Sequence, residues 1–234
     1  MSGVNYKAIY KNTTIDPPGT ERHAKDNGVE VRMPDQSFLQ IISRRGFPSR
    51  RNRFCCAILK EYKVYDYAVV GVRRDESAKR AERYKEPEMC RIYSKTEKAR
   101  QYMPLLEWTS DDVAAFVADR KLKCHPLYYD EQGNFHAERR LGCIGCPLAY
   151  RKHRIAEFKQ YPGFVKLYLR GAQRYWDAHK EGSVRRWFAD IYQWFTMALY
   201  CDSMVEFEHR FGKNLFNGGT DCKAFLEQQF NIKL

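Results

Sequence analysis

Apolar and polar positions in the first 147 residues form short runs that predict strands and helices in alternation. Residues 6–10 and 29–32 are short runs rich in strand-favouring side chains, and residues 20–26 between them predict a helix. Residues 37–45 predict a second helix, capped by Asp35 or Ser37, and residues 52–62 predict a third. This alternation is typical of an α/β fold.

The run at residues 67–72 is the clearest strand signal in the chain. It is continuously apolar and rich in valine, which is typical of a strand that is buried on both faces of a parallel sheet. The polar residues 73–77 follow it directly, and ligands of open α/β sheets bind beyond the carboxyl ends of the strands. Residues 73–77 are therefore predicted to lie at a binding position.

After Pro147 the pattern becomes almost wholly helical. Residues 149–160, 162–180 and 183–200 predict three helices rich in aromatic side chains. Residues 217–222 contain a Gly-Gly pair that we interpret as an ordinary turn with a Thr or Asp helix cap. We predict two domains: residues 1–147 form an α/β domain with a Rossmann-like parallel sheet and flanking helices, and residues 148–234 form a helical C-terminal region.

The charge of the chain indicates an anionic partner. With 41 Lys and Arg against 29 Asp and Glu, the formal net charge is +12, which attracts nucleotides, sulfate-like groups or a nucleic-acid backbone. The basic residues also gather before the first cysteine pair and on both sides of the second. The longest uncharged stretch, residues 191–201, is too short to span a bilayer, and we expect a cytoplasmic protein that does not bind a membrane.

Two close cysteine pairs are the strongest chemical signal: Cys55 with Cys56, and Cys143 with Cys146. In a cytoplasmic protein such pairs point to metal or redox chemistry, because structural disulfides are rare in that compartment. Neighbouring arginines favour the thiolate form that binds soft metals. Spacing alone is compatible with an iron–sulfur cluster, with structural zinc and with a redox-active dithiol.

The chain resembles the sulfonucleotide (PAPS/APS) reductase-like family of the adenine-nucleotide α-hydrolase-like superfamily. The resemblance rests on five segments in the family's order: Cys55-Cys56, residues 71–77, residues 105–113, residues 125–128 and residues 142–147. Residues 12–18 also resemble the segment after the second strand of PAPS-reductase-like proteins, which include relatives that serve as sulfurtransferases in DNA phosphorothioation.

The resemblance implies a site and a substrate class. In iron–sulfur members the two cysteine pairs bind one [4Fe-4S] cluster, which assigns that role to Cys55, Cys56, Cys143 and Cys146. The loop after the buried strand contacts the phosphate or phosphosulfate of an adenine nucleotide, either ATP or PAPS/APS. That role carries over to four residues: Arg73, Arg74, Ser77 and Arg80. Guanidinium groups suit bidentate contacts with tetrahedral oxyanions.

Two family features are not found in the 234 residues. The chain begins at what resembles the family's second strand, so we expect the first strand and its Ser-Gly-Gly-x-Asp-Ser phosphate loop to be missing. We also find no Glu-Cys-Gly-x-His motif, which carries the attacking cysteine of true reductases. A partner subunit or a second copy is one source of the phosphate loop.

These observations favour a PAPS-reductase-like iron–sulfur protein that works in sulfur transfer, with a nucleic acid as a candidate acceptor, over sulfite-forming reduction. No catalytic residue is assigned. The first alternative is a non-catalytic nucleic-acid-binding or assembly subunit that contains the cluster, and the second is a sulfonucleotide reductase.

Overall fold

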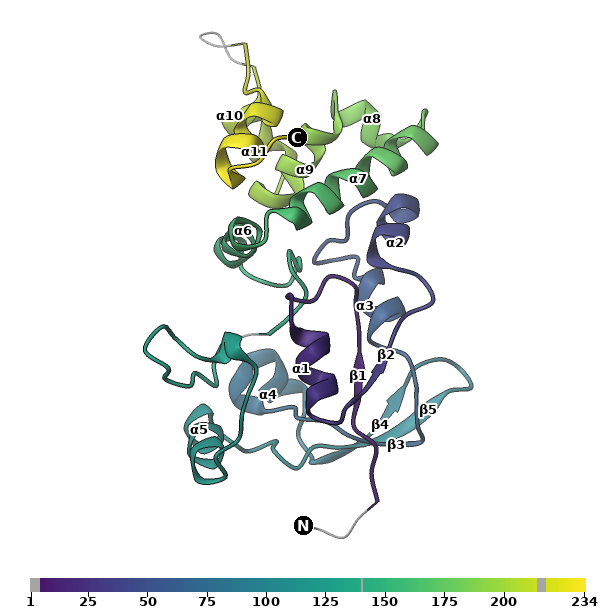
Figure 1. Ribbon diagram of the computed structural model, residues 1–234. Helices are drawn as coiled ribbons and strands as arrows, with labels where there is room; N and C mark the ends of the chain where they lie inside the picture. Colours follow the sequence, from purple (N-terminus) through teal and green to yellow (C-terminus); the bar gives the residue numbers. More distant parts are fainter. Residues whose placement is uncertain (1–4, 140, 214–217) are drawn as a thin grey trace. The chain divides into compact units, whose positions relative to one another are not determined.

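The computed structural model describes residues 5–139, 141–213 and 218–234. It shows a mixed α/β fold with parallel strands, flanking helices and a helical C-terminal region, consistent with the Rossmann-like class (Figure 1). The chain divides into two compact units. One contains residues up to 21, residues 28–60 and residues from 142 onward, and the other contains residues 22–27 and 61–141.

The first unit contains a pair of parallel strands. Strand β1 (Ile9–Lys11) pairs in parallel with β2 (Glu30–Arg32), so that Tyr10 lies opposite Val31. Helix α1 (Thr20–Asp26) follows β1, and the boundary between the units passes through this helix. The two strands and the helix confirm the elements expected at residues 6–10, 29–32 and 20–26.

Helices form most of the first unit. After β2 come α2 (Phe38–Arg45) and α3 (Phe54–Leu59). Helices alone form the regular elements described from Arg151 onward: α6 (Arg151–Gln160), α7 (Gly163–Ala178), α8 (Ser183–Trp187), α9 (Ile191–Tyr200), α10 (Met204–Phe211) and α11 (Cys222–Phe230). These helices confirm the helical pattern that the sequence predicts after Pro147.

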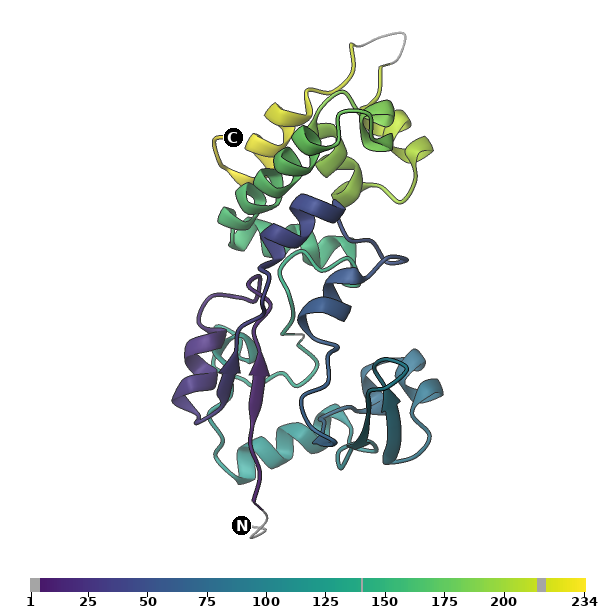
Figure 2. The ribbon, with the colours of Figure 1, turned by 90° about the vertical axis from the view of Figure 1, so that its right-hand side faces the viewer.

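Helix α2 packs on α7, and their contact builds the centre of the core (Figure 2). The apolar face of α2 buries Phe38, Ile41 and Ile42 almost completely. Gly171 of α7 allows this approach, because a Cβ atom there would overlap the side chain of Ile42. Ser37 caps α2 in a capping box with Gln40, which decides between the two predicted caps.

The predicted helix at residues 183–200 is broken in the structure. Phe188 adopts an extended conformation after α8, and Asp190 begins α9 as an N-cap that accepts the Gln193 N–H. An aspartate competes for backbone donors inside a helix, so its side chain favours a new start. Farther on, the Asp221 side chain caps α11 by accepting from the backbone N–H groups of Lys223 and Ala224. The predicted aspartate cap is confirmed. Asn217, which opens the turn predicted at residues 217–222, lies outside the described residues.

The second unit contains a three-stranded mixed sheet in the order β3-β5-β4. Strand β3 (Tyr67–Val69) runs parallel to β5 (Lys98–Tyr102), and β4 (Glu88–Ile92) pairs antiparallel with β5. Helix α4 (Ala78–Arg83) follows β3 through a short 3₁₀ turn, Arg74–Glu76. Helix α5 (Ser110–Asp119) begins after Thr109, which forms a capping box with Asp112.

Strand β3 differs from its predicted environment. A strand buried on both faces was expected, yet Tyr67 is 76% exposed and Val69 is 73% exposed. The strand lies at the edge of its sheet, and these two side chains share a face because side chains alternate along a strand. The continuous apolar run therefore predicted the strand correctly, but its prediction that both faces are buried was wrong.

Candidate functional site: four cysteines around one cavity

Cys55 and Cys56 lie in the first turn of α3, as predicted. The loop from Gly46 to Arg53 leads into this helix, and Gly46 needs its positive φ of 73° to end α2. Phe54 and Leu59 are buried and fix the helix against the core of the first unit. The two neighbouring cysteines are thereby held on a short helix with little freedom to move.

The loop that carries Cys143 and Cys146 is fastened by its backbone. The Ile144 N–H donates to the Ile15 carbonyl at 2.8 Å, and the Tyr168 hydroxyl donates to the Ile144 carbonyl at 2.8 Å. The Gly145 N–H donates to a Glu157 carboxylate oxygen at 2.9 Å. Helices α6 and α7 thus supply the side chains that hold the loop in place.

A third attachment comes from the basic segment before α3. Arg50 donates to the carbonyl oxygens of Pro147 and Ala149, at 3.1 and 3.4 Å. This guanidinium connects the segment that precedes one cysteine pair with the residues that follow the other. Basic residues lie around both cysteine pairs in the sequence. In the structure one of them, Arg50, holds these two segments together.

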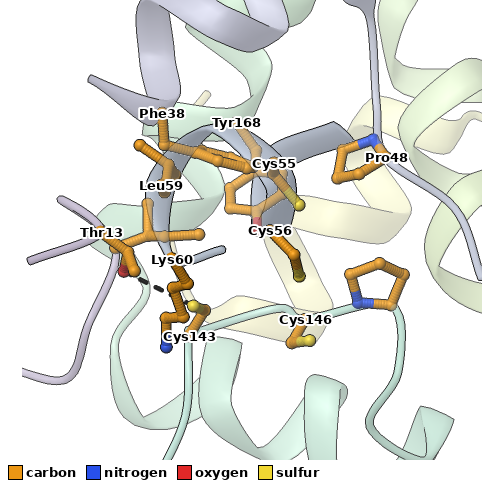
Figure 3. A pocket seen from close by; sticks show the side chains of 12 residues that line it. Thr13, Phe38, Pro48, Cys55, Cys56, Leu59, Lys60, Cys143, Cys146 and Tyr168 are labelled. Atoms are coloured by element: carbon orange, nitrogen blue, oxygen red, sulfur yellow. Dashed lines mark hydrogen bonds between the residues drawn. The ribbon is translucent and has the colours of Figure 1, made fainter. Parts of the chain in front are cut away.

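The four cysteines line one small, largely apolar cavity (Figure 3). Its volume of about 20 Å³ has room for about one water molecule. The first unit supplies every lining residue: Thr13, Ile15, Phe38, Pro48, Cys55, Cys56, Leu59, Lys60, Cys143, Cys146, Pro147 and Tyr168. Two cysteine pairs far apart in the sequence therefore meet at one place.

Cys143 is turned away from a shared centre in this arrangement. Its thiol lies 3.5 Å from the Thr13 hydroxyl and 4.0 Å from a carboxylate oxygen of Asp16, and Figure 3 shows it beside Thr13 and Lys60. Among the residues that the structure describes, no three His, Cys, Asp or Glu side chains are already arranged to hold a metal ion. For all four sulfurs to bind one metal centre, side chains such as that of Cys143 have to rotate.

The environment of Cys55 and Cys143 favours the protonated form of these two thiols. The hydrogen bond with Cys56 raises the pKa of Cys55, and burial and the neighbouring cysteines raise it further. Burial also raises the pKa of Cys143, against the opposing effects of Lys60 and Thr13. Four thiols crowded in an apolar pocket repel one another once ionised, and a bound cation removes that repulsion.

Lys60 supplies a positive charge on the Cys143 side of the cavity. Burial opposes this charge, but Cys143 and Asp16 raise the pKa of the ammonium group on balance. Its Nζ lies 3.8 Å from Asp16, which also accepts from the Tyr10 hydroxyl at 2.5 Å and from the Thr13 N–H at 2.8 Å. The segment after β1 is thus tied to the cysteines by one polar network.

The donor set fits a soft metal centre in its chemistry. Cysteine sulfurs bind iron–sulfur clusters and zinc, and the apolar side chains of Phe38, Leu59 and Tyr168 line the same cavity. The four cysteines stand out in the sequence as candidate ligands, whereas Thr13, Lys60 and Glu157 do not. Thr13 belongs to the segment 12–18 that we singled out, whereas nothing in the sequence pattern marked Lys60 or Glu157.

The predicted substrate residues lie together in the second unit, after β3. Arg73 is buried and donates to Asp75 and to the Ser110 hydroxyl, at 3.5 and 3.4 Å. Asp75 also accepts from the backbone N–H and the hydroxyl of Ser110, at 2.8 and 2.9 Å. These contacts attach the loop to the start of α5.

The remaining predicted substrate residues are also engaged within the protein. Arg74 pairs with Glu107 and donates to the carbonyl oxygens of Tyr84 and Lys85. Ser77 caps α4, and Arg80 pairs with Glu76. An anionic ligand would have to compete with these carboxylates, so the loop is not a preformed phosphate cradle.

Comparison with known proteins gives one family and one relative. The model of the phosphoadenosine phosphosulfate reductase domain matches residues 18–149, more than half of the chain. An uncharacterized 37.8 kDa protein in the gpa 5' region of Escherichia phage 186 is 34% identical over 158 residues. The match covers 61% of this chain and 44% of the phage protein, so this chain spans less than half the length of that relative.

None of the helices in the described ranges has the length and apolar composition needed to cross a bilayer.

Proposed function

Because the chain belongs to the phosphoadenosine phosphosulfate reductase domain family, we propose that it is an iron–sulfur protein that handles an adenine nucleotide or sulfonucleotide. Sulfur transfer is favoured over sulfite-forming reduction. The observation that carries the proposal is the meeting of Cys55, Cys56, Cys143 and Cys146 at one cavity.

In the proposed site the four cysteines hold a [4Fe-4S] cluster, and structural zinc is the alternative occupant. A cluster supplies electron-transfer or sulfur-binding chemistry. The protein's own residues anchor the Cys143–Cys146 loop through Glu157 and Tyr168 and place the Lys60 charge beside Cys143. Apolar side chains complete the lining of the cavity, and each of the four cysteines is half-buried.

The preference for sulfur transfer is supported by the segment that follows β1. Residues 12–18 resemble the corresponding segment of PAPS-reductase-like proteins, which include phosphorothioation sulfurtransferases, and this segment contributes Thr13 and Asp16 beside the Cys143 thiol. The segment therefore contacts the proposed centre directly.

The proposed nucleotide, ATP or PAPS/APS, is bound through the loop after β3. Arg73, Arg74, Ser77 and Arg80 lie within seven positions of one another, and the guanidinium groups suit phosphate or phosphosulfate oxygens. Arg74 and Arg80 would exchange their present carboxylate partners for the ligand, whereas buried Arg73 holds the loop to Ser110.

The second candidate function is a nucleic-acid-binding or assembly subunit that uses the metal centre for structure. It is supported by the net charge of +12 and by exposed basic side chains at intervals of four on α7: Lys166, Arg170 and Arg174. A row at this spacing lies on one face of a helix and suits a phosphate backbone.

Nucleotide binding separates the two functions. The measurement is isothermal titration of anaerobically purified protein with ATP, PAPS and APS, with and without a partner subunit or longer polypeptide that supplies a phosphate loop. Saturable binding of an adenine nucleotide, absent for an equal concentration of inorganic phosphate, is expected. No binding in any combination, together with salt-dependent binding of DNA or RNA, would support the non-catalytic alternative instead.

A further inference from the structure

The segment that leads into the first cysteine pair carries positive charge that the protein itself does not neutralise. No Asp or Glu occurs from residue 36 to residue 60. Residues 44–53, which we call the arginine segment, contain five exposed arginines: Arg44, Arg45, Arg50, Arg51 and Arg53. Among the residues that the structure describes, none of these five forms an ion pair with a carboxylate, whereas Arg74 pairs with Glu107. Exposed guanidinium groups without a carboxylate partner are available to an external anion.

Contacts with neutral groups give the arginine segment a defined shape. The Arg45 guanidinium lies over the ring of the buried Phe54, with 5.6 Å between its carbon and the ring centroid. Farther along, the Ser49 N–H donates to the Asn52 carbonyl, and the Ser49 hydroxyl accepts the Asn52 N–H, each at 3.1 Å. This turn exposes Arg51 to solvent. The segment is therefore ordered by the protein, while its charge remains for a partner.

An exposed aromatic side chain adjoins the arginine segment. Arg50 donates to the carbonyl oxygens of Pro147 and Ala149, which connects the segment with the residues before α6. Tyr150 follows directly and is 70% exposed, and its ring contacts that of His153 with 6.0 Å between the centroids. Proteins that bind single nucleic-acid strands combine these two features, because cations hold the phosphates and aromatic rings stack on unpaired bases.

The arginine segment and the residues before Tyr150 both border the cysteine cavity. Pro48 of the segment and Pro147, three residues before Tyr150, line the cavity together with the four cysteines (Figure 3). All of these residues belong to the first unit. A polymer that binds the arginine segment and Tyr150 therefore lies beside the cavity that contains the sulfurs.

We propose that the arginine segment and Tyr150 form a surface that binds a single strand of DNA or RNA. The guanidinium groups contact its phosphates, and one base stacks on Tyr150. Five arginines within ten positions suit the repeated phosphates of a polymer, whereas a mononucleotide offers its phosphates at one place only. The surface follows from the charge and exposure of its residues, and its role in holding a sulfur acceptor rests on the proposed function.

Fluorescence anisotropy with labelled oligonucleotides of about 12 nucleotides tests this surface. The full chain, purified without oxygen, is titrated with single-stranded DNA, single-stranded RNA and duplex DNA at several salt concentrations. We expect single strands to bind more tightly than the duplex, because bases that are stacked within a duplex do not reach an aromatic side chain. Binding of either strand supports the inference, and the tighter of the two identifies the class of nucleic acid.

Variants locate the binding surface. The double variant Arg51→Gln with Arg53→Gln should reduce the slope of log affinity against log salt concentration by about 1.4. Tyr150→Ala should weaken binding about 5- to 150-fold, whereas Tyr150→Phe, which keeps the ring, should bind like the wild type. Lys159→Gln with Arg186→Gln removes two exposed charges elsewhere in the same unit and is the matched control. Circular dichroism and iron content are measured for every variant.

The outcomes separate this inference from the proposed function. If the wild type contains iron and binds an adenine nucleotide but no oligonucleotide, the inference is wrong and the proposed function stands. Tighter binding of the duplex, or an equal loss in the control variant, also contradicts the inference. Displacement of the oligonucleotide by ATP at equal phosphate concentration would assign the surface to the nucleotide instead. Oligonucleotide binding that depends on Arg51, Arg53 and Tyr150 in a protein without iron would support the surface and contradict the proposed function.

Discussion

The carboxylate of Glu157 accepts the backbone N–H of Gly145, with 2.9 Å between Oε2 and N. Gly145 is buried and lies between the two cysteines of the second pair, so a residue on helix α6 fixes the loop that carries them. The relationship connects the helical C-terminal region with the cysteine chemistry in the same unit. It also shows how a loop with no regular structure presents its two sulfurs at a defined place.

Removal of this acceptor is predicted to weaken the loop. Glu157→Ala leaves the Gly145 N–H unpaired, which costs about 1–3 kcal/mol in the free energy of unfolding. Glu157→Gln keeps an acceptor and is expected to lose less. Urea unfolding of the two variants measures the difference, and equal stability of Glu157→Ala and the wild type would show that the bond does not anchor the loop.

Gly145 itself is predicted to be intolerant of a side chain. Its φ is +71°, and a Cβ atom would overlap the ring of Phe158. Left-handed backbone costs about 1–2 kcal/mol for alanine, and overpacking adds about 1–3 kcal/mol, so Gly145→Ala should lose about 2–5 kcal/mol of stability.

Gly28→Ala is the matched control for this substitution. Gly28 belongs to the same unit and has a φ of +70°, but its Cβ would meet open space. The control is expected to lose only the backbone term, about 1–2 kcal/mol. Equal losses for the two variants in urea unfolding would exclude a packing role for Gly145.

The sequence allowed good prediction of elements whose signals are local. Ser37 was one of two predicted caps, and it begins α2 close to the start of the predicted range of residues 37–45. The cysteine pairs were also local signals, and the structure brings all four cysteines to one cavity.

Features that depend on tertiary contacts were not predictable in the same way. Tyr67 and Val69 lie on an exposed face of the sheet that contains β3, and an apolar run does not encode which faces of a sheet are covered. Lys60 and Glu157 reach the cysteines through the packing of α3 and α6, and neither residue stands in a recognisable motif. Asp190 interrupts the predicted helix at residues 183–200 because its side chain caps the new helix α9. Hydrophobic periodicity alone did not predict this break.

The loop around His136 is predicted to respond to pH. Hydrogen bonds with Asp130 and then Glu138, at 2.9 Å each, raise the pKa of His136 above its ordinary value. The stabilisation from these contacts is therefore fully present below the unfolded pKa of about 6.5 and is lost as the pH rises through the folded value.

Nuclear magnetic resonance titration of the His136 ring measures this effect. Asp130→Asn is expected to lower the pKa of His136 more than Glu138→Gln does, because Asp130 makes the larger contribution. A His136 pKa that is insensitive to Asp130→Asn would contradict the assigned cause.

Arg74 is predicted to contribute to nucleotide affinity. Its guanidinium lies after β3 and pairs with the Glu107 carboxylate. Phosphate oxygens can compete with that carboxylate for the guanidinium. Loss of one charge-assisted contact corresponds to about 1.5–3 kcal/mol, so Arg74→Gln should bind the nucleotide about 10- to 100-fold more weakly. Isothermal titration checks this, with Arg120→Gln, an exposed arginine after α5, as the control. Equal weakening by both variants would indicate loss of overall charge rather than a specific contact.

The metal content of the protein tests the central claim most directly. The chain is purified without oxygen, and iron, acid-labile sulfide and zinc are measured per chain for the wild type and for Cys143→Ser, with Cys201→Ser, a buried cysteine outside the cavity, as the control. We predict about four iron and about four sulfide ions per chain in the wild type and in the control, and a loss of both in Cys143→Ser. A colourless wild-type protein with one zinc ion per chain, or with no metal, would contradict the account.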